Sequence, residues 1–564
     1  MIVVINCSNM TTEKSDRLKE PPAPELVATA YAREAADAAL LYTGMSFADL
    51  AHVVMLVEAG IAPQEAGAEL IRALLEIHPH PPLDFGLDPA RGDLYSNREA
   101  YLKMFTPAVG WLAAGRARRE ATTIGYRIAV RTRLLTLASA LADCASAGLD
   151  LAEAHRATLF PDYTYLQPAQ PTSFGHYLLT FIYPILRDLD RLRAAFARTN
   201  LSPAGSGSVN GSRLPLNREL LAQLLGFDGL IPHTRDAMWQ ADGPIEVAAL
   251  LAAALVNLDR LAEDLQIFST SEFGLIELAD RHTRISLIMP QKKNPYSLAY
   301  LRGVCGEMIG TLAAMAAVGK SPSGQIDNRI FAYGDIPRAL DTTANAVQLM
   351  ASVLRGVTVN TERAAQRAAE DFIGATDLAE VIMQQGRSPA PAAQAQATER
   401  PYDYKAAHAL VARAVRLALE KGETTITADL LNAARRDDPP GRLYPDLTPE
   451  TIAEALDPAR IVQTRTGPGG AAESSVAQMI AECRAITADH LRWRETAQLR
   501  LDAAEAQLLL TATALSLGSP QPAAPPEPPP EEPRQPQSWE EAFYAEFKDL
   551  PQPPVGRKRR RFSE

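Results

Sequence analysis

The chain has 564 residues, of which 47% are hydrophobic and 22% charged, with 42 prolines and only four cysteines. This composition excludes a wholly disordered or fibrous protein and indicates a large globular one whose core needs no disulfides. The net charge of -11 offers no chain-wide attraction to nucleic acid. The cysteines lack the close spacing of a metal site, and no stretch reaches the roughly 18 uncharged apolar residues of a membrane span. We therefore expect a cytoplasmic protein that binds neither nucleic acid nor membranes.

Helical patterns dominate the chain. Ala, Leu, Arg and Glu are abundant, and apolar residues recur three and four positions apart over long segments. The clearest segment is 246–268, and similar patterns run over 115–147, 297–318 and 336–354. These segments predict an all-α protein with a long central helical bundle. Their many small residues would let helices approach closely, within one chain or between subunits.

Composition divides the chain into three folded domains and a tail. The predicted parts are an N-terminal helical domain over 1–114 with a flexible start, a central bundle over 115–370, a C-terminal helical domain over 371–515 with a surface insertion at 386–401, and a tail over 516–564. The tail is rich in proline, which favours extended disordered backbone over a packed core.

The tail also carries two short signals. Trp539, Phe543 and Phe547 fall four residues apart after a helix-capping pattern, so they would form one aromatic stripe on a short helix. Such a stripe can dock on a partner protein or on the protein's own bundle, or the helix can remain unformed. The basic run at 557–561 could touch phosphate, but a solvated terminus explains it equally well. We do not expect a nucleic-acid function.

Three turn-rich loops interrupt the helices at 161–176, 202–215 and 281–295. Catalytic and binding residues are often found in such loops. The third contains SLIMPQKKNP at 286–295, which by itself is as well explained as a polar loop that leads into a helix. The segment closely resembles the SSxMPxKxNP signature of the fumarase and aspartase superfamily, and its QKKNP form is similar to the argininosuccinate lyase branch.

Four further segments resemble motifs of that branch in the same order. They are GRARRE at 115–120, YTYLQPAQPTSFGHYLL at 163–179, SRLPLNRELLAQLLGF at 212–227 and EALDPARIVQTRTGPGG at 454–470. The resemblance covers roughly residues 25–500. It implies an all-helical three-domain subunit, a homotetramer whose active sites are built from loops of three subunits, and reversible elimination of an amine from a succinyl group to give fumarate. It implies no cofactor and no metal.

The resemblance assigns roles within the third loop. Ser286 takes the place of the family's catalytic serine, whose alkoxide removes a proton next to a carboxylate. Serine is a weak base, so a nearby cation and oriented amides would have to activate it, and Lys292 supplies the charge. Lys292 and Asn294 match the residues that bind the substrate carboxylate. Ile285 and Leu287 replace a glycine and a serine of the family, which should stiffen a loop that closes over substrate.

Other matched positions imply contacts with the rest of the substrate. Gln170, which precedes a proline, could equally be a structural hydrogen-bonding residue. The substrate-binding residues that the resemblance implies are Thr164, Gln167, Gln170, Arg116, Arg118 and Arg119.

One catalytic pair of the family is missing. Tyr165 stands where the family has a histidine, and Ala299 stands where it has the glutamate that orients that histidine. Loss of both members indicates altered acid chemistry. Tyr165, with a reference pKa of roughly 10, could protonate the leaving group, or it could merely fill space. In the second case the proton would come from water or from a residue such as Tyr95 or His282.

The substrate-binding motifs also differ. Arg119 replaces an asparagine of the family, which suggests an additional anionic group on the substrate, although Arg119 could also pair with Glu120 or Asp93. The family's YNKDxQEDK segment has no counterpart at 323–337. A site that loses hydrogen-bonding partners loses affinity steeply, so these changes make argininosuccinate a doubtful substrate.

Three hypotheses follow from these matches and departures. The leading one is an argininosuccinate-lyase-like carbon–nitrogen lyase with a different amine half in its substrate. The second is a catalytically weak or inactive relative that is retained for binding or assembly. The third is an ordinary argininosuccinate lyase with a substitute acid.

Overall fold

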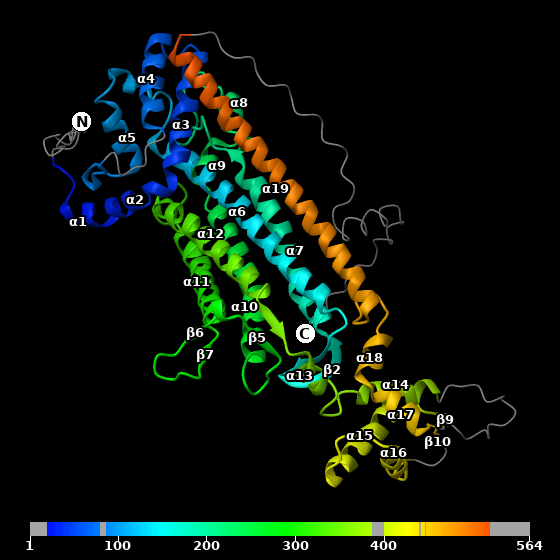
Figure 1. Cartoon of the computed structure of the whole chain (residues 1–564). Helices are drawn as coiled ribbons and strands as arrows, with labels where there is room; N and C mark the ends of the chain where they lie inside the picture. Colours follow the sequence, from blue (N-terminus) through cyan, green and yellow to red (C-terminus); the bar gives the residue numbers. More distant parts are fainter. Residues whose placement is uncertain (1–19, 79–85, 386–399, 439–441, 446, 519–564) are drawn as a thin grey trace, which may run out of the picture. The chain divides into compact units, whose positions relative to one another are not determined.

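The long helical patterns fold as predicted. The computed structural model describes residues 20–78, 86–385, 400–438, 442–445 and 447–518. Six long helices of the described chain lie side by side, parallel or antiparallel to one another (Figure 1). They are α6 (Arg118–Ala154), α7 (Phe174–Thr199), α10 (Asp242–Phe268), α11 (Tyr296–Gly319), α12 (Asp327–Leu354) and α19 (Glu473–Ser516). The all-α prediction and its central bundle are confirmed.

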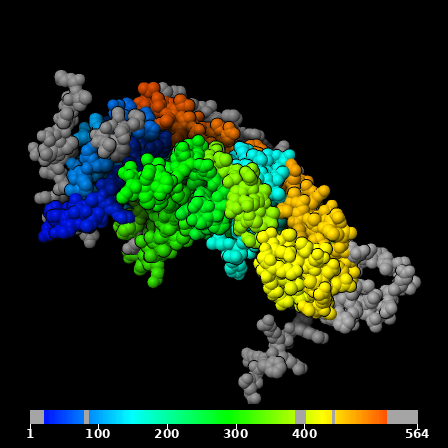
Figure 2. All heavy atoms as spheres, turned by 60° about the horizontal axis from the view of Figure 1, so that its bottom comes forward, coloured from blue at the N-terminus to red at the C-terminus, as the bar shows by residue number. Residues whose placement is uncertain are grey.

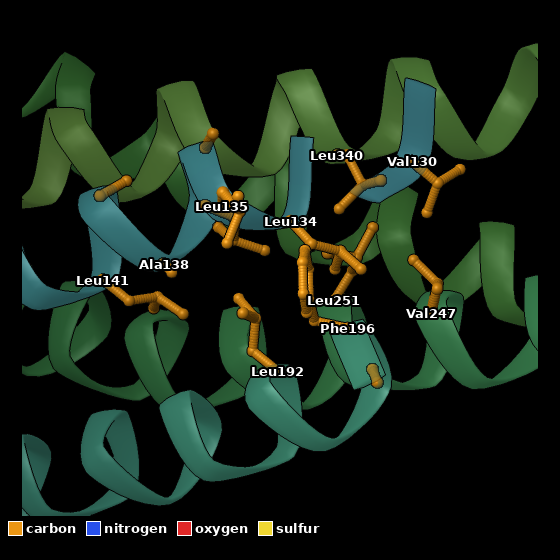
Figure 3. Packing of buried hydrophobic residues seen from close by; sticks show 14 of the residues in the cluster. Val130, Leu134, Leu135, Ala138, Leu141, Leu192, Phe196, Val247, Leu251 and Leu340 are labelled. Atoms are coloured by element: carbon orange, nitrogen blue, oxygen red, sulfur yellow. The ribbon is translucent and has the colours of Figure 1, made fainter. Parts of the chain in front are cut away.

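Aliphatic side chains from four of these helices interdigitate in the middle of the bundle (Figure 3). Leu134 of α6, Leu192 and Phe196 of α7, Leu251 of α10 and Leu340 of α12 are each at most 2% exposed. Full burial of one such side chain stabilises a fold by about 1.5–3 kcal/mol. The core therefore holds the helix ends, and the loops attached to them, in fixed positions.

Shorter elements surround the start of α6. Close packing there depends on two glycines: a Cβ atom on Gly44 would lie 2.6 Å from the carbonyl oxygen of Gly125, so no larger residue fits at this crossing of α3 and α6. These elements are α1 (Pro24–Leu26), η2 (Val27–Tyr31), α2 (Ala32–Ala36), α3 (Ala38–Glu58), α4 (Gln64–Ile77), η4 (Pro89–Arg91), α5 (Leu94–Leu102), η5 (Pro107–Trp111), α8 (Arg218–Leu224) and α9 (Thr234–Trp239).

A second hydrophobic core lies between α12 and α19 in the sequence. Its centre includes Ile382, Leu410 and Leu431, and its atoms gather into a compact mass, shown in yellow in the space-filling view (Figure 2). The helices that form this core are α14 (Ala375–Gln385), α15 (Tyr404–Lys421), α16 (Ala428–Arg435) and α17 (Pro449–Leu456). Two further helices flank it in the sequence, α13 (Thr361–Arg367) and α18 (Pro458–Thr464).

All described residues belong to one compact unit, so the division into three domains stays a prediction. The predicted insertion lies outside the described residues, apart from Arg400 and Pro401. The Pro-rich tail beyond Gly518, with its aromatic stripe and basic run, also lies outside them.

The described residues form five short two-stranded sheets that the sequence did not predict, and two of these sheets carry candidate site residues. Within the described residues the pairs are antiparallel β1 (Leu159–Thr164) with β2 (Gln167–Ser173), β5 (Ile276–Leu278) with β8 (Val357–Val359) and β6 (Arg284–Ile285) with β7 (Lys293–Asn294), and parallel β3 (Leu201–Ser202) with β4 (Gly229–Leu230) and β9 (Arg400–Pro401) with β10 (Arg442–Leu443). A turn of 3-10 helix, η6 (Asp280–His282), precedes β6.

Among the described residues, three helices are long and apolar enough to cross a membrane by length and composition alone. Each contains an 18-residue segment whose mean hydropathy is high although the segment includes one or two charged residues. The protein itself covers most of α3 and α6, whose apolar windows are 83% and 67% buried. The window of α11 is only 28% buried. Much of this apolar helix is therefore uncovered in the single subunit.

Candidate active site

The segment SLIMPQKKNP at 286–295 begins in the connection between β6 and β7 and includes strand β7. We call the hairpin of residues 284–294 the signature hairpin and its connection the signature loop. Arg284 pairs with Asn294 and Ile285 with Lys293 across the two strands. The side-chain amide of Asn294 donates to the carbonyl oxygen of Arg284 at 2.9 Å, and the backbone N–H of Ser286 approaches the carbonyl of Lys292 at 3.4 Å. The hairpin therefore gathers Ser286, Lys292 and Asn294 at its neck, although five residues lie between the serine and the lysine in the sequence.

An amide is aimed at the hydroxyl of Ser286. The backbone N–H of Met289 donates to Ser286 Oγ at 3.1 Å. A hydrogen bond to the charged form of a group favours that form, so this amide would help to stabilise a serine alkoxide. A serine base needs such an oriented amide, and the sequence alone does not identify which residue supplies it.

The two lysines of the signature hairpin differ in their partners. Lys293 Nζ lies 2.9 Å from Glu277 and 2.8 Å from Asp280, and its hydrogen bonds to these two carboxylates raise its pKa. Lys292 is exposed and has no ion pair within the part of the chain that the structure describes. Of the two neighbours, Lys292 is the one whose charge is available to a ligand.

The tip of the signature hairpin is apolar and uncovered. Ile285, Leu287 and Ile288 are 71%, 99% and 86% exposed. Several neighbouring apolar side chains with such large exposed fractions are rare on a protein surface. They indicate that another surface covers this hairpin.

The first turn-rich loop is the β1–β2 hairpin. Thr164 and Gln167 face each other across the strands, and Tyr165 and Leu166 form the two-residue turn with φ values of 55° and 57°. Bulky residues seldom adopt this left-handed conformation, which costs roughly 1–2 kcal/mol per residue. Tyr165 is fully exposed, and Gln170 is exposed too. Tyr165 therefore fills no space inside its own subunit.

The three arginines of the GRARRE segment have separate partners. Arg116 is fully buried, and its guanidinium donates to Asp49 at 2.7 Å and to the carbonyl of Ala48 at 3.2 Å. Arg98 donates to the other oxygen of Asp49 at 3.0 Å. In this subunit Arg116 is committed to a buried ionic cluster.

The other two arginines lie nearer the surface. Arg118 lies 3.3 Å from Asp93, and Arg119 lies 3.0 Å from Glu34 rather than pairing with Glu120 or Asp93.

Glu120 also belongs to this region, and the sequence pattern suggested only that it could pair with Arg119. Its buried carboxylate accepts the backbone N–H groups of Gly205 and Gly207 at 2.7 and 2.6 Å. Burial raises its pKa to about 7. Glu120 thereby fastens the second turn-rich loop to the start of α6. Its place inside the GRARRE segment, which resembles a family motif, was the one signal that the sequence offered, and no local pattern predicts a contact between residues 85 positions apart.

The chain by itself does not bring its predicted site residues together. Arg119 lies at the start of α6, and the β1–β2 hairpin follows the end of this 37-residue helix, which is about 55 Å long. The signature hairpin precedes α11, and Figure 1 shows it at the far end of the bundle from α5. Ser286 and Arg119 are therefore at opposite ends of the same subunit.

The alternative acids are buried. The Tyr95 hydroxyl has no hydrogen-bond partner within the described residues, and burial raises its pKa. His282 Nε2 lies 2.9 Å from Ser352 Oγ, and burial lowers the pKa of this histidine. Neither side chain is exposed beside Ser286 in this subunit. Among the described residues, no three His, Cys, Asp or Glu side chains form a metal-binding group.

Comparisons with known proteins bear on this arrangement. Residues 55–310 match a family described as lyase, a range that includes both hairpins. Argininosuccinate lyase from Methanothermobacter thermautotrophicus is 31% identical over 444 residues, which cover 78% of this chain and 91% of that protein. Argininosuccinate lyase from Methanoculleus marisnigri is 32% identical over 467 residues, with 82% and 91% covered. The chain belongs to the argininosuccinate lyase family.

Solved structures agree with membership of the argininosuccinate lyase family. An EDDS lyase in complex with formate superposes with a TM-score of 0.77 at 30% identity and covers 88% of this chain and 97% of that chain. Class II fumarase from Schistosoma mansoni, with a TM-score of 0.62, 13% identity and coverage of 78% and 95%, shares the fold. The resemblance inferred from the signature loop is confirmed, and the protein is a carbon–nitrogen lyase of this family.

Proposed function

We propose that this lyase reversibly eliminates an amine-bearing product from a succinyl-type substrate, with release of fumarate and with an amine half other than that of argininosuccinate. One observation carries the proposal: the signature hairpin keeps Ser286, Lys292 and Asn294 together and leaves Lys292 without an ion pair among the described residues. The altered amine half is supported by the lost motif at 323–337 and by Arg119 in place of an asparagine.

In this mechanism Ser286 is the base. Its alkoxide, stabilised by the Met289 amide and by the charge of Lys292, removes the proton next to the substrate carboxylate. Negative charge then builds on that carboxylate, where Lys292 and Asn294 bind it more strongly than in the ground state. Expulsion of the amine gives fumarate, and no cofactor takes part.

Tyr165 delivers the proton to the leaving nitrogen. Its complete exposure at a strained turn supports this role, because strained and exposed side chains with no structural duty are typical of functional sites. Thr164, Gln167 and Gln170 on the same hairpin bind substrate, as does Arg118. Arg116 contributes through the Asp49 cluster that positions the start of α6.

The active form is a cytoplasmic homotetramer. Ser286 and Arg119 lie at opposite ends of the bundle. A complete site therefore needs subunits whose bundles pack antiparallel, so that Ser286 of one subunit lies near Arg119 of another. The uncovered face of α11 supports such packing, because a Cβ atom on Gly303, Gly306 or Gly310 would meet nothing within 4 Å in the subunit. Small residues of this kind allow close helix–helix contact.

Assembly can be tested by native mass spectrometry. Gly306→Leu should break the tetramer, whereas Gly110→Leu, at a glycine with equally open surroundings, should leave it intact. Equal masses for the two variants would exclude α11 as the interface.

The activity is tested by incubation of the purified protein with fumarate and a panel of amines, with argininosuccinate as a separate substrate. Loss of fumarate absorbance and the masses of the adducts report turnover. We expect addition of at least one amine and little cleavage of argininosuccinate. Argininosuccinate turnover at the rate of the relatives would contradict the altered substrate, and silence across the panel would favour the inactive alternative.

A further inference from the structure

A small hollow opens where the N-terminal helices meet the starts of α6 and α12. It encloses about 360 Å³ of empty space including its mouth, of which only about 20 Å³ can hold the centre of a water molecule. Its charged lining residues are Glu34, Asp37, Asp93, Arg119 and Arg329. A hollow of this size accepts a small polar group rather than a whole metabolite.

Each carboxylate of the hollow already has a cationic partner. The pairs are Glu34 with Arg119 at 3.0 Å, Asp37 with Arg338 at 2.6 Å and Asp93 with Arg118 at 3.3 Å. The acidic groups are therefore neutralised within the protein and do not call for a cationic ligand.

Arg329 is different, because it is only 3% exposed and neither Nη1 nor Nη2 has a hydrogen-bond partner among the described residues. Burial lowers its pKa, and the positive charge of the nearby Arg119 acts in the same direction. A buried guanidinium whose Nη1 and Nη2 donate no hydrogen bonds within the described residues is costly. The fold thus maintains an unfavourable cation at the wall of the hollow.

A second buried arginine of the same region provides the contrast. Arg127 Nη1 donates to the carbonyls of Arg198 and Thr199 at 3.1 and 2.8 Å, and its Nη2 donates to Gln240 at 2.8 Å. This arginine is a structural clamp. The chain can therefore satisfy a buried guanidinium here, yet it does not satisfy that of Arg329.

Arg329 is nevertheless held in place. Its guanidinium carbon lies 4.3 Å from the centre of the Trp239 ring, and Trp239 Nε1 donates to the carbonyl of Ser208 at 2.8 Å. The adjacent Asn328 donates to the carbonyl of Gln240 at 3.1 Å. Stacking occupies a face of the guanidinium and leaves its N–H edges available for a planar anion.

We propose that Arg329, with Arg119 across the hollow, binds a carboxylate-sized anionic group on the amine half of the substrate. This inference rests on the proposed function and narrows the amine half to one that bears a carboxylate. Because the hollow lies at the end of the bundle away from Ser286 of the same subunit, the amine half and the succinyl half of one substrate contact different subunits.

Binding is tested without turnover. Propionate is titrated into the full-length protein at constant ionic strength, followed by thermal unfolding and calorimetry, with inorganic phosphate as a second anion. We expect saturable stabilisation by propionate in the wild type and its loss in Arg329→Met, with Arg329→Lys intermediate. A stronger response to phosphate would assign the site to a phosphate group and overturn the carboxylate. An identical propionate response in wild type and Arg329→Met would overturn the site altogether.

Stability of the free protein gives an independent sign. Removal of an unpaired buried charge should leave the melting temperature of Arg329→Met equal to or above that of the wild type. Arg127→Met should lower it while the propionate response is retained. A fall of equal size in both variants would identify Arg329 as a structural residue and contradict the proposal.

The link to catalysis is tested with pairs of amines of matched length, one with and one without a carboxylate, added to fumarate. In Arg329→Met the KM for the carboxylate-bearing amine should rise by about 10- to 100-fold, with little change for the neutral amine. Turnover combined with equal KM changes for the two amines would refute the inference and leave the lyase proposal standing. Propionate binding without any turnover would do the reverse.

Discussion

Replacement of either lysine of the signature hairpin tests the assignment of the substrate carboxylate site. Lys292 and Lys293 are adjacent, but the ammonium group of Lys293 lies within 3 Å of two carboxylates, whereas Lys292 has no ion pair among the described residues. The elimination places a second negative charge on a carboxylate that already carries one. At a separation of 4 Å and an effective dielectric constant of about 20, one lysine stabilises that extra charge by about 4 kcal/mol. At 1.36 kcal/mol per factor of ten, this corresponds to a change in kcat of roughly 10³-fold.

Lys292→Met should therefore lower kcat by about 10²- to 10³-fold and raise KM as well, since the lysine also meets the charge of the ground state. Lys293→Met is the matched control, because its exposed ion pairs contribute little to stability or charge at the site. Fumarate absorbance during addition of an accepted amine measures both constants, and circular dichroism checks the fold. Similar losses in both variants, or full activity in Lys292→Met, would refute the assignment.

Four further changes probe other parts of the molecule. Ser286→Ala should reduce the chemical step by about 10²-fold or more with mass and melting temperature unaltered, and single-turnover kinetics would expose an unaffected rate. Asp49→Ala leaves two buried guanidinium groups without their carboxylate and should lower the free energy of unfolding by about 3–5 kcal/mol; a denaturant midpoint equal to that of the wild type would show that the cluster is dispensable. Burial raises the pKa of Glu120 to about 7 from 4.5. The folded state therefore binds this proton more tightly, and the free energy of unfolding should decline as pH rises from 4.5 to 7. Urea titrations should show that this free energy depends less on pH in Glu120→Gln, and an equal pH dependence in both proteins would contradict the reasoning. Tyr165→Phe should slow substrates with basic leaving groups far more than activated ones, and uniform rates across a leaving-group series would remove Tyr165 as the acid.

Local patterns were sufficient to predict the helical bundle, whereas the role of Ser286 rests on the family resemblance and stays a prediction. The periodicity of residues 246–268 reflects one helix face, and burial of Leu251 in α10 follows directly from it. The sequence predicts a loop over 161–176 where the structure forms the β1–β2 hairpin over 159–173. Its turn residues, Tyr165 and Leu166, lack the Asn-Gly or Asp-Gly pair that usually marks such a turn.

Long-range pairings were beyond reach of the sequence. Arg116 occupies a substrate-binding position of the family motif, yet its partner is Asp49, 67 residues away. No periodicity connects two such positions. The same limit applies to Arg329, whose importance depends on the hydrogen bonds that it lacks in the described structure, and a sequence carries no trace of a missing contact.

The apolar tip of the signature hairpin ties the order of the site to temperature. Leu287 and Ile288 stand in water in the subunit, and any surface that covers them removes their apolar area from solvent. Hydrophobic burial weakens on cooling, because near room temperature its driving force is almost entirely entropic. A hairpin that is held in place by burial of its tip is therefore held less firmly at low temperature. The position of Ser286 should then be less well ordered in the cold than near room temperature.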